Sequence, residues 1–207
     1  MKILRYVSDK RGLTLVELMI VMVLSLMLMA AVFLTYQLQS GSGQAEMRKT
    51  AIQQDLRAIM EVITLDIMHA GLDPSRRDNI VGIPADVCNR GTLRVVMDLN
   101  GNGTTTNAVS DAEENITYRL TGTNLERVSN NAGITRVLSN NVIGFSFTYR
   151  DSNFQDITPA GNNSLNAALV ASVRYIDVSV TLQDRLNDVQ TGEAIARTLS
   201  RTVCRRN

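Results

Sequence analysis

The sequence predicts an α+β fold in which one long N-terminal helix packs against an antiparallel sheet. Three observations predict it. Residues 13–36 are apolar almost throughout, residues 44–71 follow an amphipathic helical pattern, and from residue 92 onward β-branched residues alternate with Gly and Asn clusters. A helical region followed by a run of strands is typical of α+β domains.

The apolar segment is long enough to cross a membrane. A bilayer core requires about 20 apolar residues in a helix, and Glu17 is the only acidic or basic residue within 13–36. Four basic residues precede the segment: Lys2, Arg5, Lys10 and Arg11. This bias predicts a cytoplasmic N-terminus and an exported remainder. A charged side chain in the membrane costs about 2.5–3.5 kcal/mol on insertion scales, which makes Glu17 a functional candidate.

A secretory signal peptide and a plain membrane anchor are the simpler alternatives. The apolar region of a signal peptide spans about 7–15 residues and is followed by a cleavage site of small residues. Here the apolar run is longer, and Gly12 precedes it. A plain anchor explains the length of the run but leaves Glu17 unexplained.

Residues 11–18, Arg-Gly-Leu-Thr-Leu-Val-Glu-Leu, resemble the processing site of type IV prepilins and type II secretion pseudopilins. The resemblance implies that a prepilin peptidase cuts between Gly12 and Leu13, and that Leu13 is then N-methylated. The family usually has phenylalanine after the cut, where this chain has leucine. Pairing of Glu17 with the Leu13 ammonium of a neighbouring subunit would lower the cost of both charges and set the register of assembly. Protonation of Glu17 within a monomer is the alternative.

The chain is therefore expected to consist of four parts. These are a cleaved leader (1–12), a membrane and filament-core helix segment (13–36), an amphipathic helix extension (37–71) and an exported β-rich domain (72–207). The apolar face of the extension comprises Ile52, Leu56, Ile59, Met60, Ile63 and Ile67. Their spacing is that of one helical face.

Glycines mark two positions along this helix. Gly41 and Gly43 indicate either a hinge or melted segment, or a pair tolerated in a continuous helix, since glycine costs about 1 kcal/mol per helical position. Gly71 and the following Asp73-Pro74 predict the end of the helix.

Seven strands are predicted after the helix. They are Thr92–Met97, Asn115–Leu120, Asn124–Val128, Ile134–Leu138, Val142–Tyr149, Ala171–Leu182 and Ala194–Val203. Three segments resemble PilW-group minor pilins: 66–71, 141–149 and 173–180. Type II secretion pseudopilins of the J type are similar in plan. This resemblance implies a pilin-like fold.

Cys88 and Cys204 are the only cysteines. Because the domain is expected to be exported, a disulfide between them is predicted. Such a bridge would close most of the globular domain and contribute about 4–5 kcal/mol in the chain-entropy model. Two free thiols are the alternative.

The segment Asp98-Leu-Asn-Gly-Asn-Gly103 is a candidate calcium loop. Loop positions 1, 3 and 5 with glycine at 6 deliver Asp98, Asn100 and Asn102 to one point. The twelfth position, which a bidentate glutamate would occupy in an EF-hand, is Val109 here. Asp111, Glu113 and Glu114 lie just beyond it and could close a longer loop. An Asn-Gly turn between strands is the alternative.

Composition favours a structural or binding role. The net charge is +1 and tryptophan is absent, so no basic or aromatic surface for nucleic acid is predicted. His69 is the only histidine, and no nucleophile lies beside a base, so no enzymatic activity is expected. Arg197, Arg201, Arg205 and Arg206 form a basic C-terminus in which positions 197, 201 and 205 share a face. They are interpreted either as a patch for DNA or an acidic partner or as protection of an edge strand.

The leading hypothesis is a minor pilin that copolymerises with other pilins and initiates assembly or caps the fibre. It would need no cofactor, with calcium as an option. Its partners would be other pilins, the prepilin peptidase and the inner membrane before assembly, and it would then reside in a surface pilus. A minor pseudopilin of type II secretion and a calcium-dependent tip adhesin are the alternatives.

Overall fold

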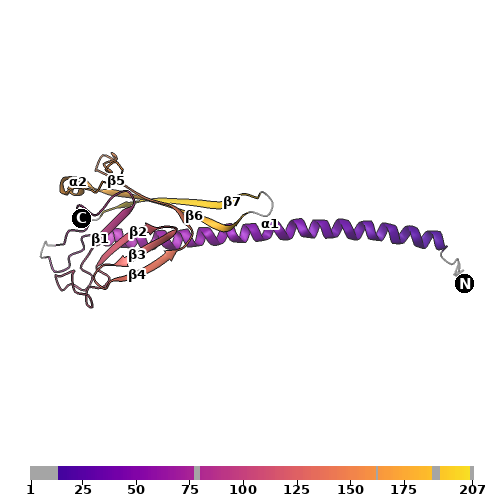
Figure 1. Cartoon of the computed structure of the whole chain (residues 1–207), viewed down its shortest axis with the longest axis horizontal. Coiled ribbons are helices and arrows are strands. Elements are labelled where there is room, and N and C mark those ends of the chain that lie inside the picture. The colour runs from indigo at the N-terminus through magenta and orange to yellow at the C-terminus, as the bar shows by residue number, and fades with distance from the viewer. Residues whose placement is uncertain (1–13, 77–79, 162, 188–191, 206–207) are drawn as a thin grey trace, which may run out of the picture. The chain divides into compact units, whose positions relative to one another are not determined.

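The computed structural model describes residues 14–76, 80–161, 163–187 and 192–205 of the 207-residue chain. The chain divides into two compact units, Met1–Ala45 and Glu46–Asn207. One helix, α1 (Leu15–His69), begins in the first unit and ends in the second (Figure 1). The α+β class predicted from the sequence is confirmed, since antiparallel strands follow this helix.

Helix α1 is continuous across Gly41 and Gly43, so no melted segment separates its halves. Its first turn is capped, because the Thr14 hydroxyl accepts a hydrogen bond from the Glu17 backbone N–H at 3.2 Å. A Thr three residues before a Glu is a sequence signature of a helix start. Gly71 follows the helix with a φ of 78°, which is the left-handed conformation that commonly ends helices.

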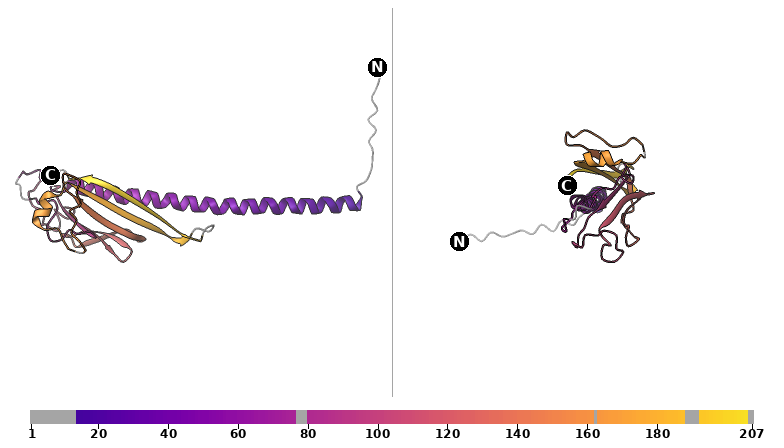
Figure 2. Two further views of the ribbon diagram at one scale, coloured as in Figure 1. Left: turned by 90° about the horizontal axis from the view of Figure 1, so that it is seen from above. Right: turned by 90° about the vertical axis from the view of Figure 1, so that its left-hand side faces the viewer.

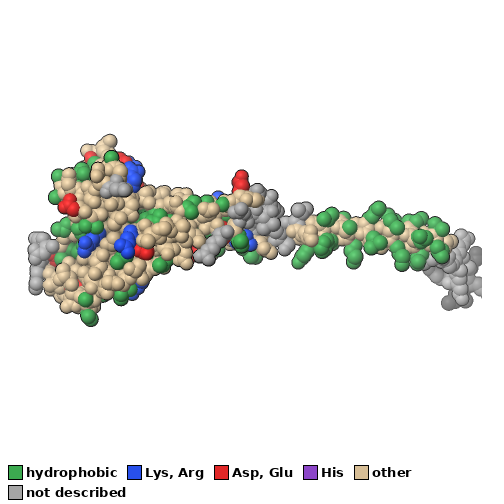
Figure 3. All heavy atoms as spheres, in the orientation of Figure 1, with side chains coloured by type: hydrophobic (Ala, Val, Ile, Leu, Met, Phe, Trp, Pro, Cys, Tyr) green, Lys and Arg blue, Asp and Glu red, His purple; other side chains and the backbone are tan. Residues whose placement is uncertain are grey.

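The first unit presents an apolar surface. The helical stretch Leu15–Gln37 is long and apolar enough to cross a membrane. Its side chains are exposed along the whole stretch, and hydrophobic groups cover it on the face shown in Figure 3. Large exposed apolar patches mark membrane or protein contacts, so this segment requires lipid or other subunits around it.

In the part of the chain that the structure describes, seven strands and one short helix follow α1. Their bounds are β1 (Thr92–Val96), β2 (Asn115–Thr121), β3 (Asn124–Ser129), β4 (Ile134–Ser139), β5 (Val142–Arg150), α2 (Ala167–Ser172), β6 (Tyr175–Asn187) and β7 (Ala194–Cys204). The predicted start of the sixth strand at Ala171 is wrong, because Ala171 belongs to α2. The Asn166 side chain caps α2 by accepting from the Leu169 N–H at 2.9 Å.

The strands form two antiparallel sheets. Sheet A has the order β1-β2-β3-β4, and sheet B has the order β5-β6-β7. The sheets lie on opposite sides of the C-terminal part of α1, above and below it in Figure 1 and again in the end-on view of Figure 2. Main-chain bonds link β5 to segments next to sheet A, with Phe147 donating to Arg90 just before β1 and Val142 donating to Thr123 in the β2–β3 turn.

The core of the second unit forms where the stripe of α1 meets both sheets. The six predicted stripe residues of α1 are all buried. Sheet A contributes Leu93, Val95, Ile116, Tyr118 and Leu125, and sheet B contributes Phe147, Tyr149, Ile176, Val178 and Val180. Burying one such side chain is worth about 1.5–3 kcal/mol, so this stripe fixes the helix between the sheets.

The predicted disulfide is not formed in the structure, where both cysteines are free. Cys88 is buried, and its sulfur accepts from the Arg94 backbone N–H at 3.3 Å. Burial raises the pKa of its thiol to about 11. Cys204 lies with the exposed even-numbered residues of β7, so the two side chains occupy different environments.

Gly82 packs tightly against the end of α1. A Cβ at this position would lie 2.4 Å from the Gly71 nitrogen and 2.6 Å from the Ala70 carbonyl carbon. Val96 of β1 bridges the same two segments, since it accepts from Gly71 N–H and donates to the Gly82 carbonyl, each at 2.9 Å. Only a residue without Cβ allows this contact between backbones.

We expect Gly82→Ala to destabilise the domain, because the neighbouring atoms are backbone and cannot move aside. Overpacking of this kind costs about 1–3 kcal/mol. Chemical denaturation of the full chain in detergent, followed by circular dichroism, would measure the loss. Gly91→Ala is the matched control, since its nearest contact would be 3.8 Å away. Equal stability of the two variants would contradict the close packing.

Candidate functional site

The predicted processing residues Gly12 and Leu13 lie outside the described residues. Glu17 is described, and its side chain is exposed in the first turn of α1. A carboxylate near a helix N-terminus is stabilised by the helix dipole. Glu17 is therefore free of the protein core and open to a partner from another chain.

The structure brings the four candidate calcium residues into one loop between β1 and β2. The Asp98 carboxylate accepts from the backbone N–H groups of Gly101 at 2.7 Å and Gly103 at 2.9 Å. The side-chain amides of Asn100 and Asn102 both donate to one Asp111 oxygen, at 3.1 and 2.9 Å. Asp111 thus connects the two ends of the loop through hydrogen bonds.

Asp111 is the centre of this loop. It also accepts hydrogen bonds from the Ser110 and Thr104 hydroxyls and from the backbone N–H groups of Thr106 and Asn107. These bonds, that of Ser110 first, hold the pKa of Asp111 well below its usual range. The carboxylate is therefore ionised, and the hydrogen bonds that it accepts from side chains and backbone N–H groups order the loop.

Glu114 adds a third buried carboxylate beside the loop. One of its oxygens accepts from the Leu99 and Asn100 N–H groups at 2.8 and 3.0 Å. Its other oxygen is buried without a partner. Burial, followed by the charges of Asp111 and Asp98, raises the pKa of Glu114. No arginine or lysine bonds to these three carboxylates in the described part of the chain.

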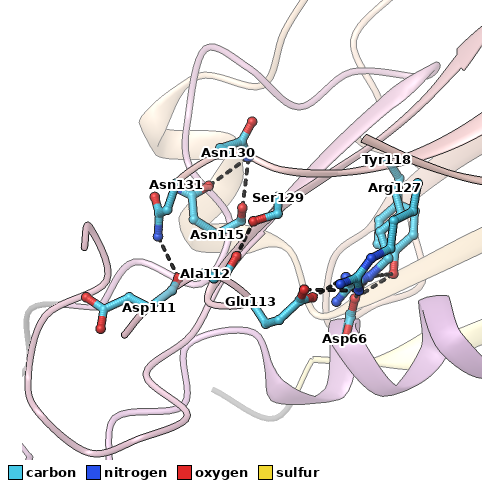
Figure 4. Close-up of polar contacts among 11 residues, drawn as sticks. Asp66, Asp111, Ala112, Glu113, Asn115, Tyr118, Arg127, Ser129, Asn130 and Asn131 are labelled. Carbon is cyan, nitrogen blue, oxygen red and sulfur yellow. Dashed lines mark hydrogen bonds and ion pairs between the residues drawn. The ribbon is translucent and has the colours of Figure 1, made fainter. Parts of the chain in front are cut away.

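A second polar cluster joins α1 to sheet A (Figure 4). Asp66 on α1 accepts from the Tyr118 hydroxyl on β2 at 2.5 Å and from Arg127 Nε on β3 at 3.0 Å. Arg127 also pairs with Glu113, which in turn pairs with Arg136 of β4 at 3.0 Å. We call Asp66, Tyr118, Arg127 and Glu113 the helix–sheet cluster.

The protonation states of this cluster follow from its geometry. Burial and the negative charge of Asp66 raise the pKa of Tyr118, so its hydroxyl remains a donor. Burial alone would lower the pKa of Arg127, but bonds to Glu113 and Asp66 raise it above its usual value. The side chains of Arg127 and Asp66 are only 12% and 14% exposed. Arg127 is thus a permanent cation held between carboxylates from two segments.

The helix–sheet cluster and the loop belong to one network. Ser129 on β3 donates to the Ala112 carbonyl, and the Asn131 amide donates to the Asp111 and Thr105 carbonyls, each at 2.8 Å. Figure 4 shows the bonds of Ser129 and Asn131 to Ala112 and Asp111, which directly precede Glu113. The loop is therefore fixed to the same strand that holds α1.

Sequence reasoning found Asp66 only as part of a resemblance and Glu113 only as a candidate to close the calcium loop, and it missed Tyr118 and Arg127. The strand register explains why they meet, since Tyr118 lies directly opposite Arg127. Directly opposite residues share a face of an antiparallel pair. One signal was available: Asp66 stands beside Ile67 and close to Ile63, on a helix face that is otherwise buried.

Asp66→Ala should lower the free energy of unfolding by about 3–5 kcal/mol, because it leaves the Arg127 charge buried without its helix partner. Urea denaturation of the full chain would measure the loss. Asp55→Ala is the matched control on the same helix, since Asp55 is exposed. The double variant Asp66→Ala/Arg127→Met should lose less than the sum of the single variants. Additive losses would show that the two residues are not coupled.

Comparisons with known families agree with the sequence and the fold. Residues 45–204 match the family described as prepilin peptidase-dependent protein B, and residues 7–33 match the prokaryotic N-terminal methylation motif. No curated protein matches the chain significantly. The first match covers most of the chain and ends at the last residue of β7, while the second covers the apolar segment with Glu17. The chain therefore belongs to the prepilin peptidase-dependent protein B family and is a type IV prepilin-like subunit of the pilin and pseudopilin type.

Proposed function

We propose that this protein is a minor pilin, a structural subunit that copolymerises into a type IV pilus and helps to initiate or cap the fibre. The prepilin peptidase cuts between Gly12 and Leu13, and Leu13 is then N-methylated. The mature helix remains in the inner membrane until the subunit enters the fibre. In the fibre the apolar half of α1 packs against the same segment of other pilins.

One observation carries this proposal above the others. The apolar half of α1 is uncovered over 23 residues, directly after a prepilin motif, and contains one carboxylate near its start. An exposed apolar surface of this kind is stable only in lipid or against other apolar helices. Glu17 supplies what a lipid anchor lacks, a charge that a neighbouring ammonium would neutralise.

The second unit suits a structural role rather than catalysis. The buried polar groups of the helix–sheet cluster bond to one another, and the packed core occupies the space between the sheets. Domains of the matched families belong to prepilin-type proteins, which act by assembly. The strongest polar contacts of this unit thus hold elements together.

The intact mass of the protein from membranes tests the processing step. We expect a chain that begins at Leu13 and carries one additional methyl group, and we expect the uncut chain when the prepilin peptidase is deleted. A chain that retains residues 1–12 in both strains would contradict the proposal. Sheared fibres should contain the mature chain; its recovery only with a secretion complex would instead identify a pseudopilin.

Glu17→Gln separates processing from assembly. The variant keeps the size of the side chain but cannot neutralise an ammonium, so we expect normal cleavage and a loss of the subunit from sheared fibres. Glu46→Gln is the matched control, since it removes an exposed carboxylate from the same helix outside the apolar segment. Normal incorporation of Glu17→Gln would remove the register role of this carboxylate.

A second candidate function is calcium binding by the loop of residues 98–114. We propose it because three carboxylates are buried there with no arginine or lysine bonded to them in the described chain, and one Glu114 oxygen lacks a hydrogen-bond partner. Among the described residues, no three His, Cys, Asp or Glu side chains are grouped so as to hold a metal ion. An ion would therefore use Asp98 and Asp111 together with amide oxygens, which rotation of Asn100 and Asn102 would supply. Calcium accepts such neutral oxygen ligands.

Thermal unfolding of the full chain in detergent with added CaCl₂ tests this candidate. Binding to the folded state would raise the midpoint, with stabilisation of about 2.7 kcal/mol when calcium reaches 100 times its Kd. Asp111→Asn should abolish the rise, and Asp55→Asn should retain it. The same rise with MgCl₂, or in Asp111→Asn, would show a nonspecific salt effect and exclude the loop as a calcium site.

A further inference from the structure

A groove runs between α1 and the edge strand β7 of the second unit. Its volume is about 690 Å³. Its floor is apolar and is formed by Met60, Leu65 and Met68 of α1 and by Leu199 of β7. Leu65 and Met68 are 48% and 46% exposed, although they lie beside the buried stripe. The groove is thus an extension of the core that no part of the described chain covers.

A smaller hollow continues the groove along α1. It is lined by Gln53, Leu56 and Arg57 of the helix and by residues 197–199 of β7, and it shares Arg57 and Leu199 with the main groove. Together the two hollows follow α1 from Gln53 to Met68, which is about 22 Å at 1.5 Å per residue. A surface of this length fits about four turns of a second helix.

Arginines form the rim of the combined groove. Arg57, Arg197 and Arg201 line it, and all three are exposed. In the part of the chain that the structure describes, none of them has an ion pair or a side-chain hydrogen bond. Glu61 is the only acidic residue that lines it. The rim therefore carries an excess of positive charge with no internal partner.

The register of β7 shows that two of these arginines are placed unusually. Arg197 lies opposite Leu182 and Arg201 lies opposite Val178, both of which are buried. Directly opposite residues share a face, so the arginines project from the core side of the sheet, over the groove. Inward-pointing charges on an edge strand oppose the addition of another strand. The occupant is therefore recognised through side chains rather than by strand pairing.

We propose that this groove binds an acidic amphipathic helix of a different pilin-type subunit in the same assembly. Apolar side chains of that helix would contact Leu65, Met68 and Leu199, and its carboxylates would pair with Arg57, Arg197 and Arg201. This inference rests on the proposed role as a filament subunit and names the surface and chemistry of one contact.

Charge complementarity decides against two other occupants. The corresponding helix of a second copy, residues 46–69, carries four acidic and three basic residues. One of the acidic residues, Asp66, is already paired with Arg127, so this helix offers the arginines no excess of available negative charge. Nucleic acid would meet the arginines but also an apolar floor without any aromatic side chain on which bases could stack. An acidic helix with one apolar face can pack against the apolar floor and also pair with the arginines of the rim.

A site-specific photocrosslink in cells that assemble the filament tests the inference. The full chain carries p-benzoylphenylalanine in place of Leu65, and mass spectrometry identifies the crosslinked peptide. We expect a helical segment of another pilin-type subunit with several carboxylates. The double charge reversal Arg57→Glu/Arg201→Glu should reduce the crosslink at least about tenfold, because it places like charges in the contact. Lysines in place of the partner's carboxylates should restore it.

Arg174→Glu is the matched control, since Arg174 is exposed but lies outside the groove lining. A crosslink to a second copy of this chain, to nucleic acid or to lipid would overturn the inference, as would no crosslink or one insensitive to the reversal. Leader cleavage and recovery in sheared fibres are measured on the same cells. If both persist while the crosslink fails, the groove assignment is wrong and the filament role stands. If the unsubstituted chain is neither cut nor recovered, the filament role itself fails.

Discussion

The burial of the apolar stripe of α1 between two sheets is the constraint on which the second unit depends. Sheets A and B share no continuous ladder, so side chains such as Ile63 and Ile67 unite them into one core. The helix–sheet cluster also fixes the position and rotation of α1 against sheet A. Hydrophobic contact alone would permit the helix to slide or rotate, whereas Asp66 meets Tyr118 and Arg127 at a single position along the helix.

The same cluster explains why the long loop after β1 is ordered. Glu113 occupies the second side of Arg127, and the segment beside it is tied to β3 through Ser129 and Asn131. The ion pair between Glu113 and Arg127 thus fixes one end of the loop, and the hydrogen bonds donated to Asp111 fix its interior. Among the described residues of this loop, one Glu114 oxygen is buried without a hydrogen-bond partner, and burying such an atom costs free energy.

Periodicity alone predicted most of the fold, because the stripe of α1 and the alternation of Val178, Val180 and Leu182 each follow from one-dimensional spacing. Periodicity did not predict features that sequence spacing does not encode. Residues 167–172 form a single helical turn and a half with no apolar stripe to reveal it. Arg127 looks like any solvated strand residue until the register places it over Asp66. The disulfide was inferred from compartment, and pairing also requires side-chain directions that composition does not contain.

The two halves of α1 are both helical, but they present different surfaces. In the first unit the helix is apolar on all sides, and its only charge is placed where a second chain could neutralise it. In the second unit the helix is apolar on one stripe, but Leu65 and Met68 extend that stripe beyond what β7 covers. Edge strands are normally protected against neighbours, and here the protecting arginines also border an open apolar floor. This pattern opposes strand pairing but leaves hydrophobic surface accessible, which favours a helical neighbour. The same two arginines would therefore exclude an added strand and orient a docked helix.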